Sequence, residues 1–167
     1  MAIGGRSVAS FNIGDKVVYP MHGAGIIEAI EEKEVLGEKH RYYIMKMPIG
    51  EMKVMIPMDN VEEIGLRQVI DDEGVEKVYH ILRGSVSKMS QNWNRRYRAN
   101  MEKIKSGDIF EVAEVVRNLA IRDREKGLST GERKMLDNAR QILISELVLA
   151  QGATEEQVET DLNKLLG

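Results

Sequence analysis

The hydrophobic period of this chain changes once, near Gly65 and Leu66, and the change limits the folds open to it. Before it, short runs of β-forming residues alternate with turn residues, which is typical of strands. After it, apolar residues recur at helical spacing behind helix-capping residues. The sequence therefore predicts an α+β chain of two domains. A small β barrel of Tudor or SH3 type covers 11–65, and a compact all-helical domain covers 66–167.

Turn and capping residues set the limits of the expected elements. The expected strands cover 17–19, 26–35, 41–47, 52–56 and 61–64. The expected helices run from Asp71 to Gly84, Asn94 to Lys105, Asp108 to Gly127, Ser129 to Gly152, and from Thr154 onward. Ser129 and Glu132 form a capping box, and Thr154 with Gln157 repeats the device. Residues 1–10 are small and polar without a period, so we expect an expression scar or a disordered extension there.

Composition excludes several classes of function. The chain has 167 residues and no cysteine, which removes disulfide scaffolds, Cys-ligated zinc and Cys nucleophiles. Its three histidines are scattered, its acids show no metal-loop spacing, and no Ser, His and Asp group together as a triad. We expect no enzyme, no cofactor and no metal. Without an apolar run of about 20 residues or a secretory signal, we expect no membrane contact and a cytoplasmic location.

A basic block lies inside this acidic chain of net charge −3. Residues 83–105 hold seven basic side chains against one acid and include the only tryptophan, Trp93. Helical spacing allows Trp93 to be a core residue, in one stripe with Tyr97, Met101 and Ile104. Alternatively, the ring lies exposed at the tip of a basic helix, where it can stack on a base. Basic neighbours would then hold phosphates, and the candidates are Lys88, Arg95, Arg96 and Arg98.

A second candidate surface lies on the expected strand 52–56. Alternation turns Met52, Val54 and Ile56 toward the core and Lys53, Met55 and Pro57 outward. An outward Met beside a Pro fits an edge strand that pairs with a partner's sheet. Single exposed apolar residues are also common on ordinary surfaces, so both interpretations stay open here.

Motifs in both halves resemble the CarD/CdnL family of bacterial RNA polymerase-binding transcription regulators. They occur in the family's order at residues 13–20, 92–97, 112–117, 127–129 and 139–143. The resemblance covers essentially all of 11–167. It implies that 11–65 is a Tudor-like RNA polymerase interaction domain, which docks on the protrusion lobe of the β subunit. It also implies that the helical half contacts promoter DNA at the upstream edge of the melted bubble.

The resemblance also assigns roles to single residues. It implies that Trp93 wedges into the minor groove at the upstream fork and stabilises the open promoter complex. Arg133 matches a further basic DNA contact, and Lys33 and Met55 match polymerase contacts. Some family members carry Arg at both of these last positions, so Met55 is a departure. The resemblance implies a protein that is a monomer when free and that meets the nucleoid through polymerase.

Two other functions remain open at this point. A stand-alone DNA-binding regulator would recognise its operator without polymerase, although the basic helix offers only Asn94 and Asn100 as base-reading residues. A pure interaction module that docks another polymerase-associated factor would keep Trp93 in its core.

Overall fold

Short β-forming runs between turn residues make the first half of the chain a five-stranded antiparallel sheet in the computed structural model, which describes residues 11–166. The expected extension at 1–10 lies outside the described residues. The strands are β1 (Lys16–Tyr19), β2 (Gly23–Val35), β3 (Glu38–Lys46), β4 (Lys53–Pro57) and β5 (Arg67–Gln68), in the order β4-β3-β2-β1-β5. The strand β4 therefore lies at an edge of the sheet.

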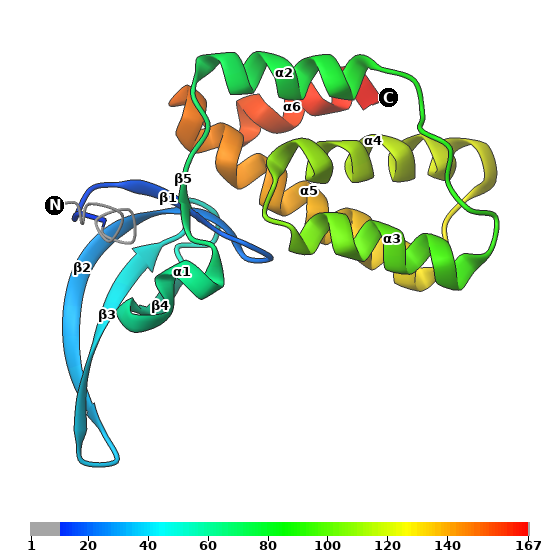
Figure 1. Ribbon diagram of the computed structural model, residues 1–167. Helices are drawn as coiled ribbons and strands as arrows, with labels where there is room; N and C mark the ends of the chain where they lie inside the picture. The colour runs from blue at the N-terminus through cyan, green and yellow to red at the C-terminus, as the bar shows by residue number, and fades with distance from the viewer. Residues whose placement is uncertain (1–10, 167) are drawn as a thin grey trace, which may run out of the picture.

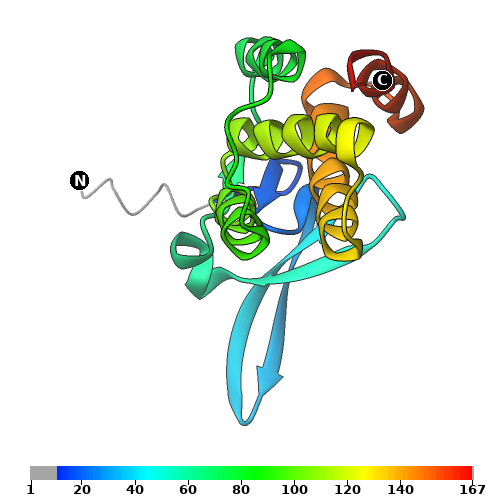
Figure 2. The same ribbon diagram turned by 90° about the vertical axis from the view of Figure 1, so that its right-hand side faces the viewer.

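The β2–β3 hairpin projects from the body of the protein (Figures 1 and 2). It turns at Leu36 and Gly37, whose φ angles are 53° and 81°. Two successive positive φ angles give a two-residue turn the twist that antiparallel strands need. The hairpin confirms the turn expected at this point.

The last strand of the sheet differs from the expectation. Residues 61–64 form the short helix α1 (Val61–Ile64) after the 3-10 turn η2 (Met58–Asn60), not a strand. Val61 is buried and Ile64 packs beside it on the same core, as one face of a helical turn requires. Gly65, at φ 81°, ends the turn and donates to the carbonyl of Val61. The fifth strand is β5 instead, which pairs with β1 beyond the expected boundary at residue 65.

The helical half follows its capping residues. It consists of α2 (Asp72–Arg83), α3 (Trp93–Lys105), α4 (Ile109–Lys126), α5 (Thr130–Gln151) and α6 (Glu155–Leu166). The side chains of Asp71, Asp108 and Ser129 each accept a backbone N–H of the helix that follows. In both views α4 lies between α2 and α3 (Figures 1 and 2). A β half followed by a helical half confirms the expected fold class.

Each half has its own core, and α5 joins them. Its Ser145 hydroxyl accepts the N–H of Ala24 in β2 at 2.8 Å. A Cβ at Gly23 would lie only 2.7 Å from that hydroxyl oxygen, so only glycine fits there. Arg67 donates two 2.8 Å hydrogen bonds to Glu146, which is completely buried. These contacts hold the sheet against the end of α5.

Candidate DNA and polymerase interfaces

Trp93 is the first residue of α3 and is only partly covered. Asn92 caps the helix by accepting the N–H of Arg95 at 3.0 Å. Trp93 is 41% exposed, whereas Ile104, at the other end of the expected stripe, is buried. The helix begins on the side of the helical half away from the sheet (Figure 1). The core interpretation of Trp93 is therefore wrong, and the ring faces solvent on one side.

The covered side of the indole lies against three residues. Its ring stacks on Tyr97 with centroids 4.9 Å apart and planes 21° apart. Its Nε1 donates to the Ser129 hydroxyl at 2.9 Å, across 36 residues of sequence. A Cβ at Gly131 would lie 3.4 Å from the ring, so the indole edge passes close over the first turn of α5.

Arg96 is not an exposed phosphate contact, which corrects the expectation for this residue. Its side chain is 4% exposed and donates to Glu132 at 2.7 and 3.2 Å. It also donates to the carbonyls of Ser90 and Gln91. Burial alone would raise the pKa of Glu132, but the hydrogen bonds and charge of Arg96 hold it below its ordinary value. The guanidinium is thus committed to this internal pair.

The other expected DNA contacts are exposed. Arg95, Arg98 and Lys88 take part in no ion pair among the described residues. Arg133 lies in the first turn of α5, close to Gly131, and donates to Asp123 at 2.6 Å. That hydrogen bond and the charge of Asp123 raise the pKa of Arg133. The structure therefore presents exposed cations on α3, on α5 and in the loop before α3.

The expected polymerase contacts lie on the sheet half. Met55 is 43% exposed on the edge strand β4, and Pro57 is half-buried at its end. The Lys53 ammonium lies 2.9 Å from Glu28, whose hydrogen bond and charge raise the pKa of Lys53. Lys33 lies exposed on the projecting hairpin, 4.0 Å from Glu31.

Alternation along this edge holds within the strand but not before it. Ile56 is fully buried and Val54 half-buried, as expected. Met52, expected to face the core, is 61% exposed. The register explains the difference, because pairing begins with Lys53 opposite Lys46, and Met52 lies in the preceding turn.

Comparisons with known proteins cover both halves of the chain. Residues 11–70 match the CarD-like/TRCF RID domain, and residues 77–163 match the CarD C-terminal domain. The chain belongs to the CarD family. A CarD-family sequence of this kind indicates a transcription-related regulator. The matched RID domain extends to residue 70 and so includes β5.

The chain is also similar to two known proteins. The chain is 49% identical over 150 residues to the putative transcription factor YdeB of Bacillus subtilis (strain 168), covering 90% of this chain and 98% of that protein. A solution NMR structure of the 72-residue N-terminal domain of Myxococcus xanthus CarD shares 37% sequence identity with it. That match covers 35% of this chain and 79% of that one, with a TM-score of 0.31.

Sequence reasoning on this CarD-family chain missed the residues that hold Trp93. The sequence predicts Ser129 only as a helix cap and Glu132 only as part of its capping box. The available signal was the spacing of Arg96, Asn100 and Ile104, since residues four apart lie on one side of a helix. In the structure all three are buried on that side of α3.

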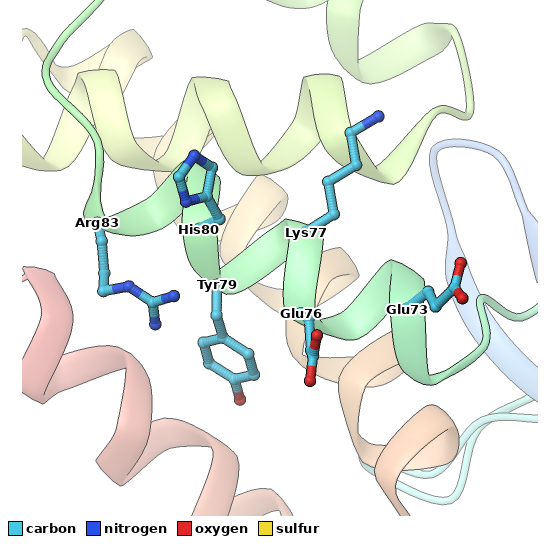
Figure 3. A pocket seen from close by; sticks show the side chains of 6 residues that line it. All are labelled: Glu73, Glu76, Lys77, Tyr79, His80 and Arg83. Atoms are coloured by element: carbon cyan, nitrogen blue, oxygen red, sulfur yellow. The ribbon is translucent and has the colours of Figure 1, made fainter.

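A separate hollow of about 630 Å³ lies along α2, on the other side of α4 from α3 (Figures 1 and 3). Its lining residues are Glu73, Glu76, Lys77, Tyr79, His80 and Arg83. Lys77 lies over the ring of Phe110, 4.2 Å from its centroid, and Tyr79 bonds to Gln151. All the lining comes from one helix, so we assign it no part in the interfaces above. No helix in the described part of the chain has the length and apolarity to cross a membrane.

Proposed function

We propose that this protein docks on the protrusion lobe of the RNA polymerase β subunit and stabilises open promoter complexes with Trp93. One observation carries the proposal: the chain's only tryptophan is exposed at the start of α3, a helix that also bears the exposed Arg95 and Arg98, and neither arginine forms an ion pair within residues 11–166. A half-exposed aromatic ring among cations matches the pattern that proteins use to hold unstacked bases.

Trp93 acts as a wedge that binds the open state of the promoter better than the closed state. Inserting a side chain into intact duplex requires a few kcal/mol of unstacking. At the upstream fork of the bubble the base step is already broken, so Trp93 contacts it without that cost. A ligand that binds the open state better than the closed state shifts the equilibrium toward the open state. About 1.4 kcal/mol of difference is enough for a ten-fold shift.

Docking occurs through the edge strand β4, whose outer side has no strand partner within residues 11–166 and can pair with a strand of the polymerase lobe. Met55 supplies an adaptable apolar contact and Pro57 lies beside it on the same edge. Lys53 and Lys33 supply positive charge, each already close to an acid of the same chain. Main-chain pairing and apolar contact therefore carry more of this interface than charge does.

Tethering by polymerase explains how an acidic protein can act on DNA. The net charge of −3 disfavours nonspecific binding to duplex. Docking raises the effective concentration of Trp93 and its cations at the fork to the millimolar range typical of short tethers, about 1 mM. The protein then binds as a monomer, and it reaches the nucleoid through polymerase.

The test is the lifetime of open complexes at saturating protein. We expect Trp93→Ala to shorten it about ten-fold, given roughly 1–3 kcal/mol for an aromatic contact with a base. Val86→Ala is the matched control, because Val86 is a comparably exposed apolar residue in the loop before α3. Equal lifetimes for Trp93→Ala and wild type, with docking intact, would overturn the proposal.

A further inference from the structure

Every hydrogen-bonding position of the Ser129 hydroxyl is in use. It accepts Nε1–H of Trp93 at 2.9 Å and the backbone N–H of Glu132 at 3.2 Å. It donates to Oε1 of Glu132 at 3.3 Å. A serine hydroxyl offers one donor and two acceptor positions, so this set is complete. The direction in which Ser129 holds the indole is therefore fixed by its other partners.

Those partners are themselves held in place. Glu132 is buried and receives two hydrogen bonds from Arg96. Arg96 also fixes the carbonyls of Ser90 and Gln91, in the loop that leads into α3. The loop, α3 and α5 are thus tied together under Trp93 by the buried Arg96–Glu132 pair, to which the exposed Ser129 is hydrogen-bonded. A buried pair whose hydrogen bonds are satisfied holds its neighbours rigidly.

Two further contacts limit the rotation of the ring. Tyr97 stacks against one face of the indole, 4.9 Å away between centroids. The missing side chain at Gly131 lets the indole edge lie close to α5, where a Cβ would be 3.4 Å from Cζ2. The ring thus has one stacked face, one bonded edge and one exposed side.

We infer that Ser129 is a positioning residue for Trp93, and that the Arg96–Glu132 pair supports it by fixing its hydroxyl. The inference rests on the proposed function and adds a property of the same site. A ring already ordered before binding loses little side-chain freedom at the fork. Because Ser129 occupies the indole N–H, Trp93 acts there through its ring and reads no base by that donor.

The first test uses the fluorescence of the free protein, in which Trp93 is the only tryptophan. Ser129→Gly removes the hydroxyl but keeps a residue type that caps helices well. Ser129→Thr keeps the hydroxyl. We expect faster local depolarisation of Trp93 in Ser129→Gly and wild-type behaviour in Ser129→Thr. Thr154→Gly is the matched control, because the Thr154 hydroxyl likewise accepts the backbone N–H three residues on, at the start of α6, far from Trp93 in the sequence. Unchanged depolarisation in Ser129→Gly would overturn the inference.

The second test measures open-complex lifetimes for the same proteins. Freezing one rotamer-rich side chain corresponds to a factor of about two to ten, so we expect Ser129→Gly to shorten the lifetime by that factor. Ser129→Thr and Thr154→Gly should match wild type.

The two proposals fail in different ways. If Trp93→Ala shortens the lifetime and Ser129→Gly loosens the ring without shortening it, the positioning inference is wrong and the wedge stands. If Trp93→Ala itself has no effect on the lifetime, the proposed function is wrong, whatever the fluorescence shows.

Discussion

Arg95, Arg96 and Arg98 lie within one turn of α3, but only Arg96 is buried. Replacing Arg96 by Gln leaves the Glu132 carboxylate buried without its charge partner. Breaking a buried ion pair in this way destabilises a protein by about 3–5 kcal/mol. We expect that loss for Arg96→Gln in urea unfolding, against a change within about 0.5 kcal/mol for Arg98→Gln. Similar stabilities for the two variants would contradict the structure.

A second acid of the helical half makes the stability depend on pH. The hydrogen bond from Lys103 at 2.7 Å, with help from Ser87, holds the pKa of Glu114 below its ordinary 4.5. Folding therefore favours the ionised form. The stability it adds is complete above pH 4.5 and is lost as the pH falls through the lowered pKa.

The variant Glu114→Gln tests this dependence. We expect urea unfolding of the wild type to show a steeper loss of stability between about pH 5 and pH 3 than the variant shows. Parallel curves for the two proteins would mean that Glu114 has the same pKa when folded and unfolded.

The buried face of α3 is not the face that the apolar residues predict. Arg96 is buried, whereas Trp93, three residues before it, is exposed. The apolar stripe through Trp93, Tyr97 and Met101 suggested a buried face, whereas the buried face runs through Arg96 and Asn100. Their polarity hid this face, because a pattern based on hydrophobicity does not register a buried residue whose partner, such as Glu132, lies 36 residues away.

Elements with local start and stop signals were predictable from sequence. The starts of α2, α4 and α5 agree with their capping residues, because a cap and the N–H it satisfies lie within three residues. The last strand was not predictable. Two paired residues in β5 are too few to show a period, and Val61–Ile64 has the composition of either a strand or a helical turn.

A charge on the edge strand β4 tests the proposed docking surface. Met55→Asp places a charge where we propose that a polymerase strand pairs, so binding to the β-subunit lobe should weaken at least about ten-fold, a change of 1.4 kcal/mol. The melting temperature should stay close to that of wild type, because the side chain is already exposed. Met52→Asp makes the same change three residues earlier, outside the strand.

The two β4 variants together separate docking from folding. Met52→Asp should bind the lobe like wild type. Equal weakening by both variants would point to a general effect of charge on the sheet half. A large drop in the melting temperature of Met55→Asp would instead show that Met55 supports the core.

At the scale of the whole molecule, the contact between the halves was not predictable. Gly23, Ala24 and Ser145 meet across more than 120 residues, and neither motif nor spacing links them. The pair Arg67–Glu146 likewise joins β5 to α5. The structure thus connects a sheet half and a helical half that sequence reasoning treated separately, and it sets the direction of α3 relative to β4 (Figure 1).

This connection gives the proposed mechanism a defined geometry. A protein docked through β4 presents the start of α3, and with it Trp93, to one place on the promoter. The effect of Trp93 should therefore be confined to the upstream edge of the bubble. A fluorescent adenine analogue such as 2-aminopurine, placed at successive promoter positions, reports unstacking at each of them.

The measurement that tests the central claim is the fluorescence of that analogue in open complexes with wild type and with Trp93→Ala, both at saturation. The account predicts that wild type changes the signal only at the upstream fork, and that Trp93→Ala removes this change while still binding polymerase. A signal at the fork that is the same for both proteins, or a Trp93-dependent signal elsewhere in the bubble, would contradict it.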